Sequence, residues 1–231
     1  MTQQIPESAL QVLPFYLVAD ESGSMGGAPI DSLNEALPEL HAAVTTDPYL
    51  ASIARFGIIG FSDDAEIIFP LTDLADVTSF PKMHPKGLTS FGSAFALLRA
   101  TIDQDIADLR AQGVTPHRPL VFFFSDGEPT DHSWQDSLRD IHDKSWKNHP
   151  NVVAFGLGQA NPTVMQKVAT VQAFIQSDDG YLDPAAAIKT MIQAVTQSII
   201  SSAGSIRSGQ GPQVLIPQSV PGMIALSADP L

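Results

Sequence analysis

The 231-residue sequence predicts an α/β fold, with a doubly wound, mostly parallel sheet that carries helices on both faces. Short apolar segments rich in β-branched and aromatic residues alternate along the chain with longer segments whose apolar residues recur every three or four positions. Two of the short segments, 57–61 and 121–124, are apolar throughout, as expected of central strands that helices cover on both sides. The length fits a single domain, since domains usually hold about 100–200 residues.

Each expected element is recognised by its apolar spacing and its flanking residues. Strands are expected at 15–19, 56–61, 66–69, 120–124, 152–157 and 173–175. Helices are expected at 30–44, 91–109, 134–146, 163–168 and 184–200. Asp183 and Pro184 are typical of a helix start, because Asp can cap free backbone amides and Pro fits the first helical position. Four residues separate the second and third strands, too few for a parallel crossover, so one antiparallel strand is expected at a sheet edge.

The C-terminal part of the chain differs in composition from the rest. Residues 201–208 are rich in Ser and Gly, and several prolines follow them, which is typical of a linker. We therefore expect a domain at 13–204 and a tail at 205–231. Segments 214–216 and 223–226 are too apolar for a solvated tail, so we expect them to dock on their own domain or on a partner. The alternative is a disordered tail that carries a short linear motif.

The composition excludes several classes of function. With 12 Lys and Arg against 25 Asp and Glu, the formal net charge of -13 repels nucleic acids and anionic membranes, so neither is an expected partner. The absence of Cys rules out disulfides, thiolate zinc sites and cysteine nucleophiles. The first 20 residues have no Lys or Arg, and Pro14 interrupts their short apolar stretch, which fits neither a signal peptide nor a membrane span. We expect a cytoplasmic protein.

Oxygen-bearing side chains follow two of the expected strands. Asp20, Ser22 and Ser24 come directly after the first strand, and Asp126 follows the strand at 120–124. Ligands of such sheets gather at the carboxyl ends of the parallel strands, where these side chains can converge. Carboxylates brought together raise each other's pKa unless a cation lies between them. Oxygen ligands without Cys or His favour Mg²⁺, Mn²⁺ or Ca²⁺ over zinc or copper.

The loop with Asp20, Ser22 and Ser24, the segment Gly87-Leu88-Thr89 and the loop with Asp126 together resemble the metal-ion-dependent adhesion site of the von Willebrand factor A (VWA) family. The three motifs occur in the same order along the chain as in that family. The resemblance extends over roughly residues 13 to 200. It implies that the metal ligands are the hydroxyls of the Ser and Thr residues and the two carboxylates, bound directly or through water: Asp20, Ser22, Ser24, Thr89 and Asp126. It also implies that an acidic residue of a protein partner completes the coordination. Leu88 stands where the family usually has Gly, which makes Thr89 the least secure ligand.

Glu21 and Glu128 flank this motif. They are the candidate residues of a partner-binding rim around the metal. Simple solvation of a loop is the plainer role, and it is the preferred one for Glu21.

Enzymatic and other metal-site alternatives fit the sequence less well. An aspartate-nucleophile phosphatase that uses Mg²⁺ typically carries a second Asp two residues after the first, where this chain has Ser22. A serine hydrolase needs a Gly-x-Ser-x-Gly elbow, which neither Ser24 nor Ser93 supplies. An EF-hand needs Gly at the sixth loop position, where this chain has Met25. We therefore expect a binding protein and no enzyme.

Residues 19–25, Ala-Asp-Glu-Ser-Gly-Ser-Met, are similar to the same loop of the cytosolic bacterial TerY-type branch, which is linked to tellurite resistance and stress response. This resemblance implies a metal-dependent protein-binding module that serves as a signalling or stress-response scaffold, with protein kinases or phosphatases as partners. Other bacterial members serve AAA+ ATPases as substrate adaptors. That role and a Mg-dependent phosphatase-like hydrolase remain the alternatives.

Overall fold

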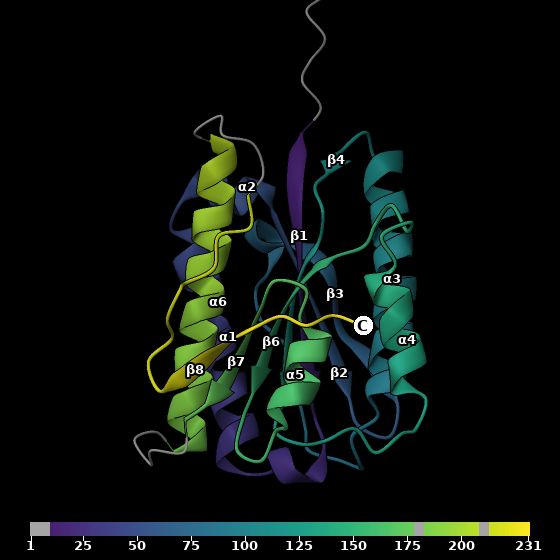
Figure 1. Cartoon of the computed structure of the whole chain (residues 1–231). Helices are drawn as coiled ribbons and strands as arrows, with labels where there is room; N and C mark the ends of the chain where they lie inside the picture. The colour runs from purple at the N-terminus through teal and green to yellow at the C-terminus, as the bar shows by residue number, and fades with distance from the viewer. Residues whose placement is uncertain (1–9, 178–182, 208–212) are drawn as a thin grey trace, which may run out of the picture.

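The structure is a computed structural model that describes residues 10–177, 183–207 and 213–231. Predictions that concern Ser208, Pro212 or the first nine residues lie outside the described residues. Figure 1 shows a sheet between two layers of helices. The strands are β1 Gln11–Asp20, β2 Ala54–Phe61, β3 Ala65–Asp73, β4 Thr115–Pro116, β5 Leu120–Ser125, β6 Asn151–Gly156, β7 Gln172–Gln176 and β8 Met223–Ser227. The helices are α1 Ala28–Thr45, α2 Pro48–Ile53, α3 Phe91–Ala111, α4 Trp134–His142, α5 Pro162–Val168 and α6 Pro184–Arg207, with short 3₁₀ turns at Gly23–Met25 and Leu74–Asp76.

The strand order across the sheet is β3-β2-β1-β5-β6-β7-β8, and β4 pairs with the beginning of β1. The central strands are parallel, which confirms the predicted fold class. The antiparallel edge strand predicted after β2 is β3. The prediction of one antiparallel edge is incomplete, because β8 adds a second one by pairing with β7. β8 follows a Pro-containing segment, and its pairing with β7 is a long-range contact that local sequence does not reveal.

Alternate side chains of each central strand enter different halves of the core, because successive residues of a strand point to opposite faces. In β1, Leu13, Phe15 and Leu17 pack with α1, α2 and α6. Val12 and Val18 of the same strand pack with α3, α4 and α5 on the other face. The sheet is therefore buried on both sides, and only its ends and edges reach the surface. No helix among the described residues is long and apolar enough to cross a membrane.

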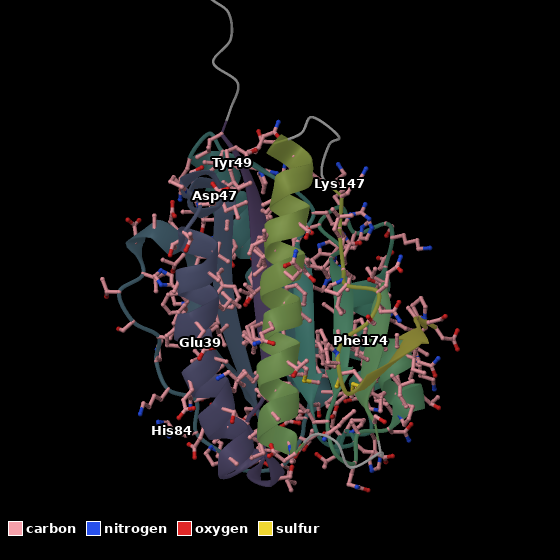
Figure 2. The ribbon with its side chains drawn as sticks, turned by 90° about the vertical axis from the view of Figure 1, so that its left-hand side faces the viewer. Glu39, Asp47, Tyr49, His84, Lys147 and Phe174 are labelled. Atoms are coloured by element: carbon pink, nitrogen blue, oxygen red, sulfur yellow. The ribbon has the colours of Figure 1, made fainter. Side chains whose placement is uncertain are left out.

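The helix starts follow the local sequence. The Asp183 carboxylate accepts a hydrogen bond from the Ala186 amide at 2.8 Å, so the predicted start of α6 is confirmed. Asn161 caps α5 in the same manner, through the Thr163 amide at 2.9 Å. Figure 2 shows α1 and α6 side by side on one face of the sheet.

The linker predicted at 201–208 is wrong for residues 201–207, which continue α6 to Arg207. Small residues of this stretch, such as Ser202 and Ser205, are buried, and small side chains let the helix lie close to its neighbours. Ser205 donates its hydroxyl hydrogen to the Ser202 carbonyl at 2.7 Å, which satisfies that group inside the helix. The predicted boundary at residue 204 thus falls within α6.

The apolar pieces after α6 dock on the chain's own domain, as predicted. Val214, Ile216 and Met223 pack against the core under α1 and α6, and Leu226 packs against the core of the other face. Leu215 and Ile224 remain exposed.

Candidate metal centre

The predicted oxygen cluster lies where β1 and its neighbour β5 end, at the lower end of the sheet in Figure 1. The two strands are parallel and paired. Asp20 is the last residue of β1 and Asp126 directly follows β5, so their carboxylates lie at the same end of the sheet. The Ser24 hydroxyl donates a hydrogen bond to Asp126 Oδ1 at 2.8 Å. Ser24 Oγ also lies 3.0 Å from Ser22 Oγ. A continuous row of oxygens therefore joins the loop after β1 to the loop after β5.

Asp20 is the innermost residue of the cluster and is completely buried. Its Oδ1 accepts a hydrogen bond from the Ser22 amide at 2.8 Å, and its Oδ2 accepts one from the Ser125 hydroxyl at 2.6 Å. Burial raises the pKa of the Asp20 carboxyl to about 6, with a smaller rise from the nearby Asp126, although the hydrogen bonds from Ser125 and Ser22 act in the opposite direction. Burial also raises the pKa of Asp126, and the hydrogen bond from Ser24 opposes this rise.

We expect Asp20 to destabilise the metal-free protein as the pH rises. Its folded-state pKa lies above its ordinary value, so its contribution to stability is complete below that ordinary value and is lost as the pH rises through about 6. Asp20→Asn removes the buried charge and should raise the free energy of unfolding in EDTA by about 3 kcal/mol at about pH 7.5, and by much less at about pH 4. Urea unfolding of both proteins at the two pH values measures this difference. An equal difference at both pH values would contradict the assignment.

Thr89 comes to the same place from the loop before α3. Its side chain is buried, and its carbonyl accepts hydrogen bonds from the Thr130 amide at 2.9 Å and the Thr130 hydroxyl at 3.1 Å. Thr130 follows Asp126 in the next loop, so this pairing holds the two loops together. A β-carbon built on Gly127 would lie 3.8 Å from Thr89 Oγ1, which places the Thr89 hydroxyl beside the Asp126 loop. All five predicted metal ligands therefore gather at one end of the sheet.

Sequence reasoning did not assign a role to Ser125. This residue ends β5 and is completely buried. Its hydroxyl donates to Asp20 and accepts a hydrogen bond from the Gly127 amide at 3.2 Å, so it fixes both carboxylate loops. Its place directly before Asp126 at the end of a buried strand is the signal that could have identified it.

The two residues predicted for the rim have different positions. Glu128 is exposed, and its Oε1 accepts a hydrogen bond from Asn161 Nδ2 at 2.7 Å, so it is held at the surface beside the site. Glu21 is only 1% exposed, so it is neither a rim residue nor a solvated loop residue, and both predictions for it are wrong. The Glu21 side chain turns inward because Gly60 leaves room for it. A β-carbon on Gly60 would come within 2.7 Å of Glu21 Cδ.

Glu21 instead connects the metal loop to the loop that leads to Thr89. Its carbonyl accepts a hydrogen bond from the Lys86 amide at 2.6 Å, and its Oε1 accepts one from the His84 amide at 3.0 Å. The Lys86 ammonium lies 3.6 Å from Glu21 Oε2 and also pairs with Glu66. Glu21 is thus a positioning residue for the loop at 83–88.

Replacing Glu21 by Ala is expected to lower the free energy of unfolding by about 2–4 kcal/mol, because the His84 amide and Lys86 lose a buried charged partner. Glu66→Ala is the matched control, since Glu66 pairs with the same Lys86 from an exposed position and should change stability by less than about 1 kcal/mol. Urea unfolding in EDTA compares the two. Equal losses would show that Glu21 contributes no more than a surface ion pair.

The donor set fits a hard divalent cation. The hydroxyls of Ser22 and Ser24 lie between the carboxylates of Asp20 and Asp126, and the Thr89 hydroxyl lies beside the Asp126 loop. The Asp20 carboxyl is fully buried and has a raised pKa, so a bound cation would stabilise its charged form. Within residues 10–177, 183–207 and 213–231, no group of three acidic or histidine side chains could hold a metal by itself. The site therefore depends on its Ser and Thr hydroxyls.

A family model described as the von Willebrand factor type A domain matches residues 15–183 of the chain. No curated protein matches the chain at a significant level. Several solved structures resemble it, each at an identity low enough that the likeness shows the fold alone.

Proximal thread matrix protein 1 from the mussel byssus matches with a TM-score of 0.56 and 15% identity over 83% of this chain and 48% of that chain. One structure of the mussel protein is described with zinc in its MIDAS motif. The ArnB paralog VWA2 from Sulfolobus acidocaldarius matches with a TM-score of 0.52 and 18% identity over 81% and 46% of the two chains. The pilus adhesin SpaC from Lactobacillus rhamnosus GG matches with a TM-score of 0.59 and 14% identity over 84% and 30%. The chain thus spans about half or less of these proteins.

Proposed function

The chain belongs to the von Willebrand factor type A family, and we propose that it is a protein-binding module that recognises an acidic side chain of its partner through a divalent cation. The observation that carries this proposal is the chain of hydrogen bonds that links Asp20, Ser22, Ser24 and Asp126, with Thr89 beside it. VWA domains commonly act as metal-dependent interaction modules, and the donor set of this chain fits that role.

In this proposal the five residues hold Mg²⁺, Mn²⁺ or Ca²⁺, which prefer oxygen ligands. When bound, such a cation supplies a positive charge and an open coordination position for a carboxylate. The hydroxyl ligands are neutral, so two carboxylates do not exceed the charge of a divalent ion. Ser125 keeps Asp20 in place, and the exposed Ser24 and Glu128 lie where a partner can reach them. Because the mussel protein can hold zinc in its motif, binding tests should include Zn²⁺.

We further propose a cytoplasmic signalling or stress-response scaffold as the biological role. The support is the likeness of residues 19–25 to TerY-type proteins, with a kinase, a phosphatase or an AAA+ ATPase as the partner. A catalytic role is not proposed, since Ser22 occupies the position of the second Asp of aspartate-nucleophile phosphatases.

Partner capture is expected to require both the metal and the ligand set. The tagged protein should retain its partners from a lysate of the source organism in Mg²⁺ and lose them in EDTA, because a carboxylate has no cation to bind once the metal is removed. Thr89→Ala and Asp126→Ala should lose the same proteins in Mg²⁺. Asp136→Ala, which changes an exposed carboxylate on α4, is the matched control and should keep them.

Mass spectrometry of the captured proteins measures this result. Capture of the same proteins in Mg²⁺ and EDTA would reject metal-gated recognition. Loss of capture in the Asp136 control would show that general surface charge, and not the metal centre, holds the partner.

A further inference from the structure

A cavity of about 490 Å³ lies at the other end of the sheet from the metal centre. It lies where β1, β5 and β6 begin, beside Ser202 of α6 and residues 213–214. Phe15 and Leu120, both buried, line it, together with Leu13 and Val214. These side chains give the cavity an apolar floor, and its volume falls within the range of small-molecule sites.

The charged residue of this cavity is Arg118. No described residue forms a hydrogen bond or ion pair with its guanidinium. The other arginines with described side chains have partners: Arg55 pairs with Asp73, Arg139 with Asp136, Arg110 with Asn148, and Arg99 stacks on Trp146. The described lining has no Asp or Glu, in a chain with 25 of them. The cavity therefore favours an anion, unlike the acidic surface of the chain as a whole.

The wall opposite the sheet is held in place by hydrogen bonds. The Ser202 hydroxyl of α6 accepts one from the Leu215 amide at 3.0 Å, and the Ser205 hydroxyl accepts one from the Gln213 amide at 3.1 Å. These bonds fix residues 213–215 against α6, so this wall exists without a ligand. Asn151 at the start of β6 adds a side-chain amide to the lining.

We propose that this cavity binds a small organic carboxylate, whose apolar body lies against Leu13, Phe15 and Leu120 and whose carboxylate pairs with Arg118. The planar guanidinium matches a planar carboxylate through two parallel hydrogen bonds. Such a group can belong to a free organic acid or to the C-terminal residue of a peptide. In the second case, the amides of Asn151 and Gln213 have a peptide group to bind.

The test is an amide-resolved NMR titration of the full chain with hexanoate and with N-acetylleucine, compared with their uncharged amides. EDTA is present, so that the metal centre offers no cation to a carboxylate. We expect shifts in residues 13–15, 118–120, 151 and 213–214 with the acids and much weaker shifts with the amides. Arg118→Gln should weaken binding about tenfold or more, whereas Arg110→Gln, another exposed arginine, should not change it.

Tighter binding of N-acetylleucine than of hexanoate would identify a peptide C-terminus as the source, and the reverse would identify a free acid. The absence of shifts in these residues with both acids, or equal binding of acids and amides, would overturn the proposal. Asp126→Ala should leave this binding intact, so the result does not depend on the metal-dependent function.

Discussion

Asp20→Ala and Asp126→Ala are each expected to weaken Mg²⁺ binding by more than about 100-fold, because each removes one of the two negative charges that face the cation. Asp20 ends β1, Asp126 directly follows the neighbouring strand β5, and Ser22 and Ser24 join the two residues through hydrogen bonds. Loss of either carboxylate leaves one negative charge and neutral hydroxyls, which cannot balance a divalent charge. Isothermal titration calorimetry of the purified chain measures the affinity for Mg²⁺, Mn²⁺, Ca²⁺ and Zn²⁺.

Asp136→Ala serves as the control, since this exposed carboxylate on α4 pairs with Arg139 away from the site. Its metal affinity should equal that of the unmodified chain. If all three variants bind Mg²⁺ alike, the metal-site assignment is wrong. If only Asp20→Ala loses binding, Asp126 is not a ligand and the site is smaller than proposed.

Ending the chain at Arg207 is expected to lower the free energy of unfolding by about 3–5 kcal/mol. The removed segment includes β8, which covers the edge of β7, and the apolar side chains of Val214, Ile216 and Val220, which contact the core. Burial of a large apolar side chain contributes about 1.5–3 kcal/mol, so the loss of two such side chains is enough to account for the expected change.

Two substitutions within the segment distinguish the effect of its docked side chains on stability from the effect of simply shortening the chain. Val220→Ala should cost about 1–3 kcal/mol, since Val220 is 3% exposed, whereas Ile224→Ala should cost less than about 1 kcal/mol, since Ile224 is 51% exposed. Urea unfolding measures each change, and amide exchange should show protection at 223–227. Unchanged stability of the truncated chain, with rapid exchange there, would favour the disordered-tail alternative. It would also support the domain boundary predicted near residue 204.

The sequence by itself determined the fold class and the order of the central elements. Apolar residues at every second position of a strand, or at every third or fourth position of a helix, show which face of the element is buried. This information is local in the sequence. The short connection between β2 and β3 excluded a parallel crossover for the same local reason. The gathering of Asp20, Ser22 and Ser24 at one end of the sheet could be predicted, because residues directly after parallel strands lie at that end. Their role as metal ligands is implied by the resemblance to the VWA site and stays a prediction.

Tertiary structure alone decided which way the remaining side chains point and what the C-terminal segment contacts. Glu21 lies between two metal-loop residues in sequence but turns inward, because Gly60 on the neighbouring strand leaves space for its carboxylate. β8 pairs with β7, and Arg118 lines a cavity in which no described residue pairs with it. Both arrangements result from contacts between segments that lie far apart in the chain. Such contacts depend on the shape and charge of the packed core, which short-range sequence patterns do not contain.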